Sequence, residues 1–294
     1  MNFSVKEDII QLTSAWTGER LPDGRPYVPD EDLEALRGMT LEEIWQPLEL
    51  AGYRYQFEEK LQRLHEDNRK LVGRAVTAAF MPARPDLEAV VQKIGESDGR
   101  RGTHNLWVVD KLIEGDVAVI DMYDKIWEGT FVGGNLTTAI STRTKTGGAV
   151  VWGGVRDLEQ MEKVPNVQVY FRGYDPTPIR NFVMTSYNGP VRIGGAVCLP
   201  GDVVFGYRGG VIFIPPHLVR KVIDRARKSH ARDVFGFAML EQGVYTTADI
   251  DRDVWPLKVM ARLEKFIQED PRGEAYRDLD WSMEYEESKA MFGV

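Results

Sequence analysis

The sequence predicts a mixed α/β fold with helical segments on both sides of a strand-rich centre. Three observations lead to this prediction. Short runs rich in β-branched residues fill the middle of the 294-residue chain, Gly, Pro and Asp clusters separate these runs, and apolar residues at helical spacing precede and follow them. We therefore expect a mainly helical segment over residues 1–68, an α/β core over 69–229 and a helical C-terminal extension over 230–294.

The N-terminal region carries a helix-start signal. Thr40 precedes Glu43 by three residues, the spacing of a capping box, and apolar residues at helical spacing follow. Phe57, Leu61 and Leu64 continue this spacing among charged residues, which predicts an amphipathic helix over residues 54–70. Residues 22–29, with prolines at both ends, are expected to form a turn-rich connector.

The core is expected to alternate strands with helices. The expected strands are Val72–Thr77, Val117–Ile120, Ala149–Trp152, Val167–Phe171, Val203–Phe205 and Val211–Ile214. The expected helices between them are Asp86–Ile94, Leu136–Lys145 and Leu158–Lys163. Strands in more than one sheet layer are the expected arrangement.

The C-terminal region returns to helical spacing from His217 onward. A second helix is expected to open near Pro256 and to run to Gln268, because proline is tolerated in a first helical turn. The region 230–294 also holds many large apolar residues, among them Trp255, Leu257, Leu263, Phe266, Trp281 and Met291. Two interpretations stay open: this extension packs across a neighbouring subunit and completes its cleft, or it folds on its own core.

Composition narrows the classes of partner. The formal net charge of −8 argues against a surface that follows nucleic-acid phosphates. No apolar run approaches the ~18 residues of a membrane helix, and the first residues lack a signal-peptide profile. We expect a cytoplasmic protein without nucleic-acid or membrane partners. The single cysteine, Cys198, cannot form an internal disulfide and is expected to be buried, and the four histidines lack the spacing of a zinc site.

Two motifs about twenty residues apart predict a site for a small oxo-acid. The first is the glycine-rich run Gly133-Gly134-Asn135-Leu136, and the second is Gly153-Gly154-Val155-Arg156-Asp157. Backbone N–H groups that face an anion, an arginine fork and a carboxylate that binds metal suit such a ligand. Spacing alone favours a simpler structural interpretation, a solvated Arg–Asp ion pair or a cap between a strand and a helix.

Further motifs occur in a fixed order around these two. They are Leu71–Thr77, Glu114–Asp121, Phe171–Gly173, Pro190–Gly195, Pro200–Asp202 and Gly210–Pro215. In this order the chain resembles the class II 4-hydroxy-4-methyl-2-oxoglutarate aldolases. That family also contains the regulator of ribonuclease E activity and has often been mislabelled a menaquinone methyltransferase. The resemblance implies a swivelling β/β/α sandwich core and a homotrimer or a trimer-based hexamer.

The resemblance also implies roles for particular residues. Asp157 matches the family's metal-anchoring residue, and Arg156 matches its substrate-binding arginine. The backbone amides of Gly134, Asn135 and Leu136 would contact the substrate carboxylate at the start of a helix. The implied activity is a Mg²⁺- or Mn²⁺-dependent carbon–carbon lyase. It would cleave a 2-oxo acid by retro-aldol reaction, or decarboxylate it, through a metal-stabilised pyruvate enolate.

The chain departs from the family pattern at several acids. Asn135 stands where the family commonly has Glu, Trp152 where it has a water-orienting Asp, and Gln160 where the aldolases favour an acid. Tyr207 and Arg208 replace a further acidic cluster. The candidates for a substitute role, each of which has a simpler structural interpretation, are Arg172, Tyr207, Arg208, His217, Asp121 and Asp124.

A second class of function therefore remains open, a non-catalytic trimeric binding protein of the ribonuclease E regulator type. Retention of Arg156 and Asp157 favours the enzyme, and loss of the acid at Trp152 favours the binder. A methyltransferase is the weakest of the three alternatives, because no glycine-rich methyl-donor motif follows a first strand.

Overall fold

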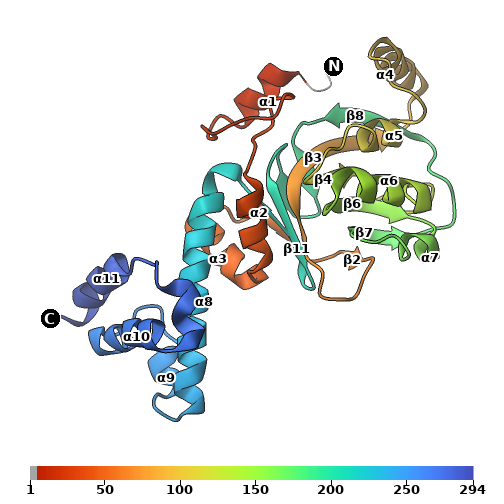
Figure 1. Ribbon diagram of the computed structural model, residues 1–294. Helices are drawn as coiled ribbons and strands as arrows, with labels where there is room; N and C mark the ends of the chain where they lie inside the picture. Colours follow the sequence, from red (N-terminus) through yellow and green to blue (C-terminus); the bar gives the residue numbers. More distant parts are fainter. Residues whose placement is uncertain (1–4, 294) are drawn as a thin grey trace. The chain divides into compact units, whose positions relative to one another are not determined.

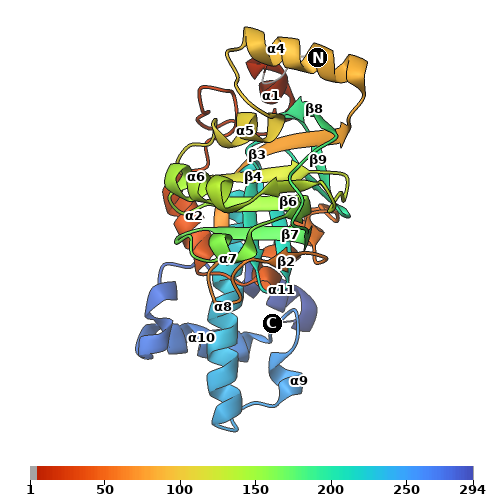
Figure 2. The same cartoon turned by 90° about the vertical axis from the view of Figure 1, so that its right-hand side faces the viewer.

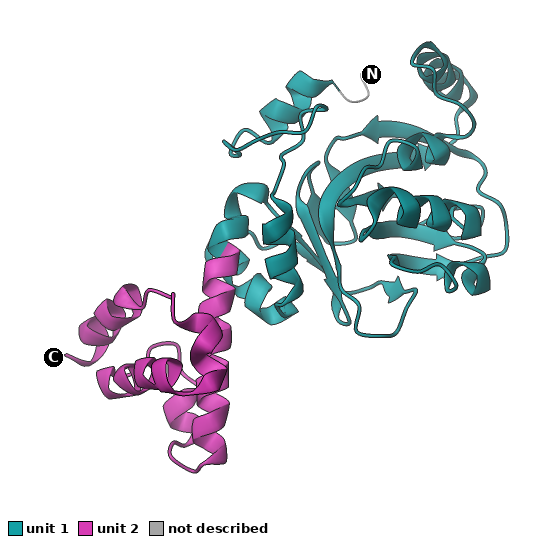
Figure 3. Ribbon diagram, viewed as in Figure 1, with its two compact units in different colours: residues 1–221 teal, residues 222–294 magenta. Residues whose placement is uncertain are grey.

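The structure, a computed structural model, describes residues 5–293 and divides into two compact units, residues 1–221 and 222–294 (Figure 3). The first unit holds the mixed α/β fold that the sequence predicts, and the second is helical. Helix α8 (Val219–Glu241) begins in the first unit and continues in the second.

The first unit begins with three helices, α1 (Lys6–Leu12), α2 (Asp30–Arg37) and α3 (Leu41–Leu50) (Figure 1). The predicted capping box is confirmed: the Thr40 side chain accepts from the Glu43 amide, and the Glu43 side chain accepts from the Thr40 amide. These two bonds satisfy amides that have no partner within the helix, which fixes where α3 starts.

The predicted helix over residues 54–70 is wrong. This segment instead forms two short strands, β1 (Phe57–Glu58) and β2 (Gln62–Arg63). The strand β1 pairs with β12 and β2 pairs with β7, so each adds to one edge of the large sheet. Pairing with an exposed sheet edge outweighs the helical spacing of Phe57, Leu61 and Leu64, because helix propensity is a weak preference that tertiary contacts override.

The centre of the unit is a ten-stranded mixed sheet with the order β1-β12-β11-β3-β4-β6-β7-β2, to which β5 adds beside β6 and β8 beside β3. Its strands are β3 (Leu71–Pro82), β4 (Asp116–Asp121), β5 (Thr130–Val132), β6 (Gly148–Val155), β7 (Gln168–Tyr174), β8 (Phe182–Tyr187), β11 (Val203–Tyr207) and β12 (Gly210–Ile214). The pairs β3/β4, β4/β6, β5/β6 and β6/β7 are parallel. All six predicted strands are present.

Both faces of the sheet are covered, which explains its continuous apolar strands. One face packs against α5 (His104–Val109), α6 (Gly134–Thr144) and α7 (Leu158–Met161) (Figures 1 and 2). The other face packs against a two-stranded sheet of β9 (Val191–Ile193) and β10 (Ala196–Cys198). Helix α4 (Pro85–Ser97) follows β3 and confirms the helix predicted over Asp86–Ile94. Cys198 is buried, as expected.

The second unit is built on its own core. After α8 come α9 (Thr247–Ile250), α10 (Leu257–Glu269), the 3₁₀-helix η2 (Pro271–Tyr276) and α11 (Ser282–Phe292). Pro256 is the N-cap of α10, as expected from its position. Trp255, Leu263 and Trp281 lie buried with Phe235 in this core. Much of the apolar content of the extension is thus explained within the unit itself.

Residues 5–293 include no helix long and apolar enough to cross a membrane.

Candidate active site

The two sequence motifs meet because their strands are neighbours. Strands β5 and β6 pair in parallel, with Val132 opposite Val155, so both end at the same edge of the sheet. The Arg156 amide donates to the Val132 carbonyl at 3.0 Å and locks the two strand ends together. The glycine run that follows β5 therefore lies against the Arg-Asp pair that follows β6.

Glycine is required where the two motifs touch. Gly133 has extended backbone (φ −144°, ψ −164°), and a Cβ added there would lie 2.5 Å from Asp157 Oδ2. It would also lie 3.0 Å from Arg156 Cγ. Without a side chain at this position, the Asp157 carboxylate approaches the start of α6, where the Gly134 N–H donates to Asp157 Oδ2 at 3.3 Å.

The Asp157 backbone adopts the left-handed conformation (φ 57°, ψ 41°), which aspartate tolerates better than most residues. Asp157 is the N-cap residue of α7, but its side chain makes no capping hydrogen bond to that helix. The turn therefore directs the carboxylate away from α7 and toward Gly134, the first residue of α6.

The arginine and the aspartate form a loose, accessible pair. Arg156 Nε lies 3.6 Å from Asp157 Oδ2, and the two side chains are 40% and 41% exposed. Ion pairs of this kind contribute little to stability, at most about 1 kcal/mol. Both charged groups can therefore exchange this contact for a ligand.

Helix α6 offers an anion site next to the pair. Its first amides, at Gly134, Asn135 and Leu136, belong to the group of helix N-terminal N–H groups without intrahelical partners. Asn135 is exposed, and Leu136 packs partly against the core beneath the sheet. The Gly134 amide already donates to Asp157, so the amides of Asn135 and Leu136 and the positive end of the helix dipole are what favour a carboxylate or phosphate at this position.

A divalent cation fits this site through one carboxylate only. Both contacts of Asp157 use Oδ2, which leaves Oδ1 for a cation. Among residues 5–293 there is no group of three or more His, Cys, Asp and Glu that could hold a metal ion. The donor set suits Mg²⁺ or Mn²⁺, since Mg²⁺ keeps several waters and needs only one or two protein carboxylates.

The residues that could replace the missing family acids do not lie together in the structure. Arg172 stacks on the Trp152 ring at 4.6 Å and pairs with Asp124 at 2.9 Å. Asp121, at the end of β4, lies opposite Trp152 in the strand register, and burial raises the pKa of its carboxyl. This group gathers around a tryptophan that is only 7% exposed and belongs to the core on the β9–β10 face of the sheet.

Tyr207 and Arg208 lie at the amino end of the parallel strand β3, opposite to the end that carries the candidate site. Gly206 pairs with Leu71, the first residue of β3, and the side chains of Tyr207 and Arg208 both contact Asn68. The candidate site is at the carboxyl ends of the parallel strands, so these two residues do not share its cleft. His217 is also elsewhere, with its Nε2 3.1 Å from the hydroxyl of Tyr53.

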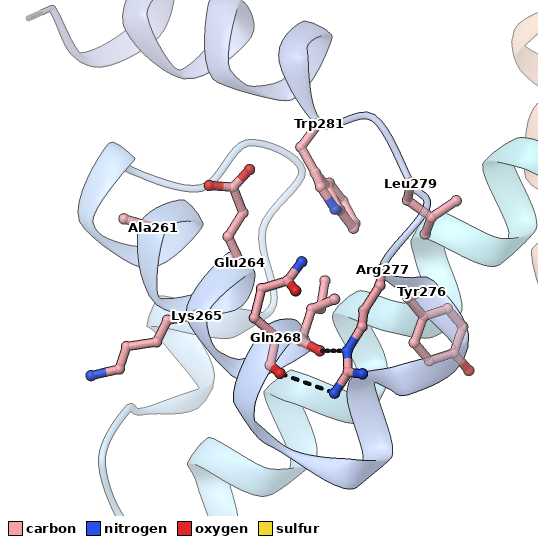
Figure 4. Close-up of a pocket in the computed structure, with 9 residues that line it drawn as sticks. Ala261, Glu264, Lys265, Gln268, Tyr276, Arg277, Leu279 and Trp281 are labelled. Atoms are coloured by element: carbon pink, nitrogen blue, oxygen red, sulfur yellow. Dashed lines mark hydrogen bonds between the residues drawn. The ribbon is translucent and has the colours of Figure 1, made fainter.

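The second unit contains a hollow of about 370 Å³ beside α10, which Figure 4 shows. Two of its charged side chains, Arg277 and Glu264, already have hydrogen-bond partners. Arg277 donates to the carbonyls of Ile267 and Gln268, and Glu264 accepts from the Tyr285 hydroxyl at 2.8 Å. These contacts indicate a structural role for the charged groups of this hollow.

Comparison with known proteins defines the class. A family model described as "RraA-like: Aldolase/RraA" matches residues 33–213, which is more than half of the chain. The chain belongs to this RraA-like family, as the ordered motifs predicted.

Two curated proteins are similar to this chain in sequence. The chain is 29% identical over 160 residues to "Protein DlpA" of Legionella pneumophila, which covers 53% of this chain and 23% of that protein. It is 29% identical over 132 residues to a "Putative 4-hydroxy-4-methyl-2-oxoglutarate aldolase" of Halalkalibacterium halodurans, which covers 44% of this chain and 61% of that one. The chain thus spans less than two thirds of the length of either relative.

Solved structures confirm the fold. Streptomyces coelicolor RraAS2, described as "an unusual member of the RNase ES inhibitor RraA protein family", matches with a TM-score of 0.61 and 24% identity, over 72% of this chain and 97% of that one. An uncharacterized protein from Pseudomonas syringae pv. tomato matches with a TM-score of 0.62 and 17% identity, over 80% and 99%. At these identities the likeness shows a shared fold.

Proposed function

We propose that the protein is a divalent-metal-dependent carbon–carbon lyase that acts on a small 2-oxo acid. The observation that carries the proposal is the convergence of the Arg156 guanidinium, the Asp157 carboxylate and the first amides of α6 at one edge of the sheet. The aldolase name of the Halalkalibacterium relative supports the reaction class. Either retro-aldol cleavage or decarboxylation of the 2-oxo acid is compatible with this set of groups.

Each group has a separate task in the proposal. Asp157 would hold Mg²⁺ or Mn²⁺ through Oδ1, and the bound ion would polarise the 2-oxo group. Arg156 would bind the substrate carboxylate with two parallel N–H donors and offset the negative charge that develops as the bond breaks. The amides of Gly134, Asn135 and Leu136 would bind the other side of the same carboxylate and fix its orientation.

Pyruvate release tests the proposal directly. Purified protein with Mg²⁺ or Mn²⁺ would be incubated with 4-hydroxy-2-oxo acids and with oxaloacetate, and pyruvate would be measured by a coupled assay. We expect turnover of at least one substrate, reversible loss with a chelator, and no turnover by Asp157→Asn. Full turnover in excess EDTA would eliminate the metal-dependent mechanism.

A second candidate is a non-catalytic regulator that binds a ribonuclease of the E type. The observation that favours it is Trp152, which is buried under Arg172 at the position where the resemblance implies a water-orienting acid. Inhibition of ribonuclease activity by the protein, in the absence of pyruvate release from every substrate above, would favour the regulator over the lyase.

The assembly proposed with either function is a homotrimer or a trimer-based hexamer. Light scattering on the full chain and on a chain that ends at residue 229 tests whether residues 230–294 take part. An oligomer and an activity that are both unchanged by truncation would show that this extension does not complete a neighbour's cleft.

A further inference from the structure

A buried carboxylate far along the chain from Arg156 and Asp157 has no charged partner. Asp202 ends a tight turn before β11, where its N–H donates to the Leu199 carbonyl at 3.1 Å. Its side chain is 3% exposed, and Oδ2 accepts one hydrogen bond, from the Leu199 N–H at 2.8 Å. Within residues 5–293 no lysine, arginine or histidine forms an ion pair with Asp202.

The isolation of this carboxylate has an energetic consequence. Burial without a compensating cation disfavours the charged form and raises the pKa of Asp202 to about 7. The buried thiol of Cys198 interacts with this carboxylate, and burial raises the pKa of that thiol as well. A cation brought to Asp202 would therefore relieve an unfavourable buried charge.

Asp202 lines a cavity of about 300 Å³ in the first unit. The walls are largely apolar and come from four separate stretches of chain: the end of α1 with the residues after it, the segment before β1, the β10–β11 connection and the start of η1 (Pro216–Leu218). The apolar lining residues are Leu12, Ala15, Trp16, Val197, Leu199, Pro215 and Pro216. A volume of 300 Å³ lies at the small end of the range for ligand pockets.

Most of the other polar side chains of the cavity are already hydrogen-bonded. The Gln56 amide donates to the carbonyls of Val197 and Phe213, and the Thr13 hydroxyl donates to the Ile9 carbonyl. Tyr53 and His217 pair with each other at 3.1 Å. Asp202 is thus the one carboxylate of the lining, and its partner is a backbone amide and not a cation.

We propose that this cavity binds a small amphipathic amine, with the ammonium group on Asp202 and the hydrocarbon part against the apolar walls around Trp16. The chemistry of the lining selects against the alternatives. A carboxylate or phosphate would meet a like charge, and a neutral alcohol would leave the buried charge uncompensated. The site is separate from the proposed lyase site, so neither proposal depends on the other.

Binding should release a proton at neutral pH. The free carboxyl is partly protonated near pH 7, whereas the ammonium complex requires the ionised form. Affinity should therefore rise with pH through about 7 and level off above it. The other titratable groups that face the cavity are Tyr53 and His217, and burial lowers the pKa of the His217 ring.

The experiment is a calorimetric titration of the full-length protein at pH 8 with cyclohexylamine, cyclohexanol and cyclohexanecarboxylate. We expect saturable binding of the amine alone, with at least tenfold weaker binding of the other two. Asp202→Asn keeps an acceptor for the Leu199 amide and should weaken amine binding at least tenfold. The matched control Asp86→Asn changes an exposed aspartate that pairs with Arg84 and should leave binding unchanged.

A second variant keeps the test decisive if Asp202→Asn does not fold. Ala15 is exposed and lines the cavity, so Ala15→Phe fills it from the surface without disturbing the core, and amine binding should be lost. Equal affinity for cyclohexanol, or amine binding that survives Ala15→Phe, would overturn the proposal. So would the absence of any amine binding to the folded wild-type protein.

Discussion

The close contact at Gly133 gives the sharpest test of the candidate site. A methyl group added by Gly133→Ala would begin 2.5 Å from Asp157 Oδ2, whereas Cβ atoms essentially never approach a neighbour within 3.0 Å. The carboxylate oxygen must therefore move by at least 0.5 Å (3.0 − 2.5), and by 0.9 Å to reach the 3.4 Å of ordinary contact (3.4 − 2.5). The same methyl group presses on Arg156 Cγ at 3.0 Å.

Misplacement of catalytic groups by about 1 Å costs on the order of 10²-fold in rate. We expect kcat/KM for pyruvate release to fall roughly 10- to 100-fold, or about 1.4 to 2.7 kcal/mol. The fold should be retained, since the extended backbone of Gly133 is open to alanine. Stability should stay within about 1 kcal/mol of the wild type.

Mn²⁺ affinity gives a readout that does not need a known substrate. Electron paramagnetic resonance titration should show weaker Mn²⁺ binding for Gly133→Ala and none for Asp157→Asn. Gly38→Ala is the matched control, because its new Cβ would meet a carbonyl at an ordinary 3.4 Å. If Gly133→Ala bound Mn²⁺ and released pyruvate like the wild type, the carboxylate at this loop would not be the metal ligand.

Three further predictions concern charged groups. Arg156→Lys keeps the charge but loses the two parallel N–H donors of the guanidinium. We expect kcat/KM for the best 2-oxo acid to be at least ~10-fold lower than in the wild type. An unchanged value would show that the role of Arg156 is structural. Arg25→Met leaves the fully buried Asp116 carboxylate without its 2.8 Å partner, and urea unfolding should show a loss of about 3–5 kcal/mol, against less than ~1 for the exposed pair disrupted by Arg84→Met. Because the pKa of Asp202 is raised from 3.8 to about 7, the native state holds a proton that the unfolded state releases, so its contribution to the free energy of unfolding falls as pH rises between these values. Asp202→Asn should flatten that slope in urea unfolding at pH 5 and pH 8, and a slope equal to that of the wild type would contradict the assignment.

The sequence by itself determined most of the local structure. Capping chemistry at Thr40, the β-branched strands and the helical spacing after Pro256 all act within a few residues, and each produced the expected element. The same locality explains the failure at residues 54–70. Phe57 and Leu61 are spaced for a helix. The segment instead forms strands, because it can hydrogen-bond to the otherwise unpaired edges of β12 and β7.

The candidate site was partly encoded in sequence. The two motifs were expected to form one site, but strand β5, which brings Gly133 and Gly134 to the same sheet edge as Arg156 and Asp157, was not among the predicted strands. Which further groups join them depended on strand register and direction. The antiparallel pairing of β11 with β3 carries Tyr207 and Arg208 to the opposite end of the sheet, and no local pattern encodes that pairing.

The Asp202 cavity was decided by tertiary structure alone. Its walls come from segments near residues 12–16, 53–56, 197–202 and 215–217, which are joined only when the sheet and the N-terminal helices pack. In the sequence Asp202 belongs to an ordinary Pro-Gly-Asp turn. Within residues 5–293 no cation pairs with it, and this isolation follows from burial, which is a property of the folded chain that residue spacing along the sequence does not predict.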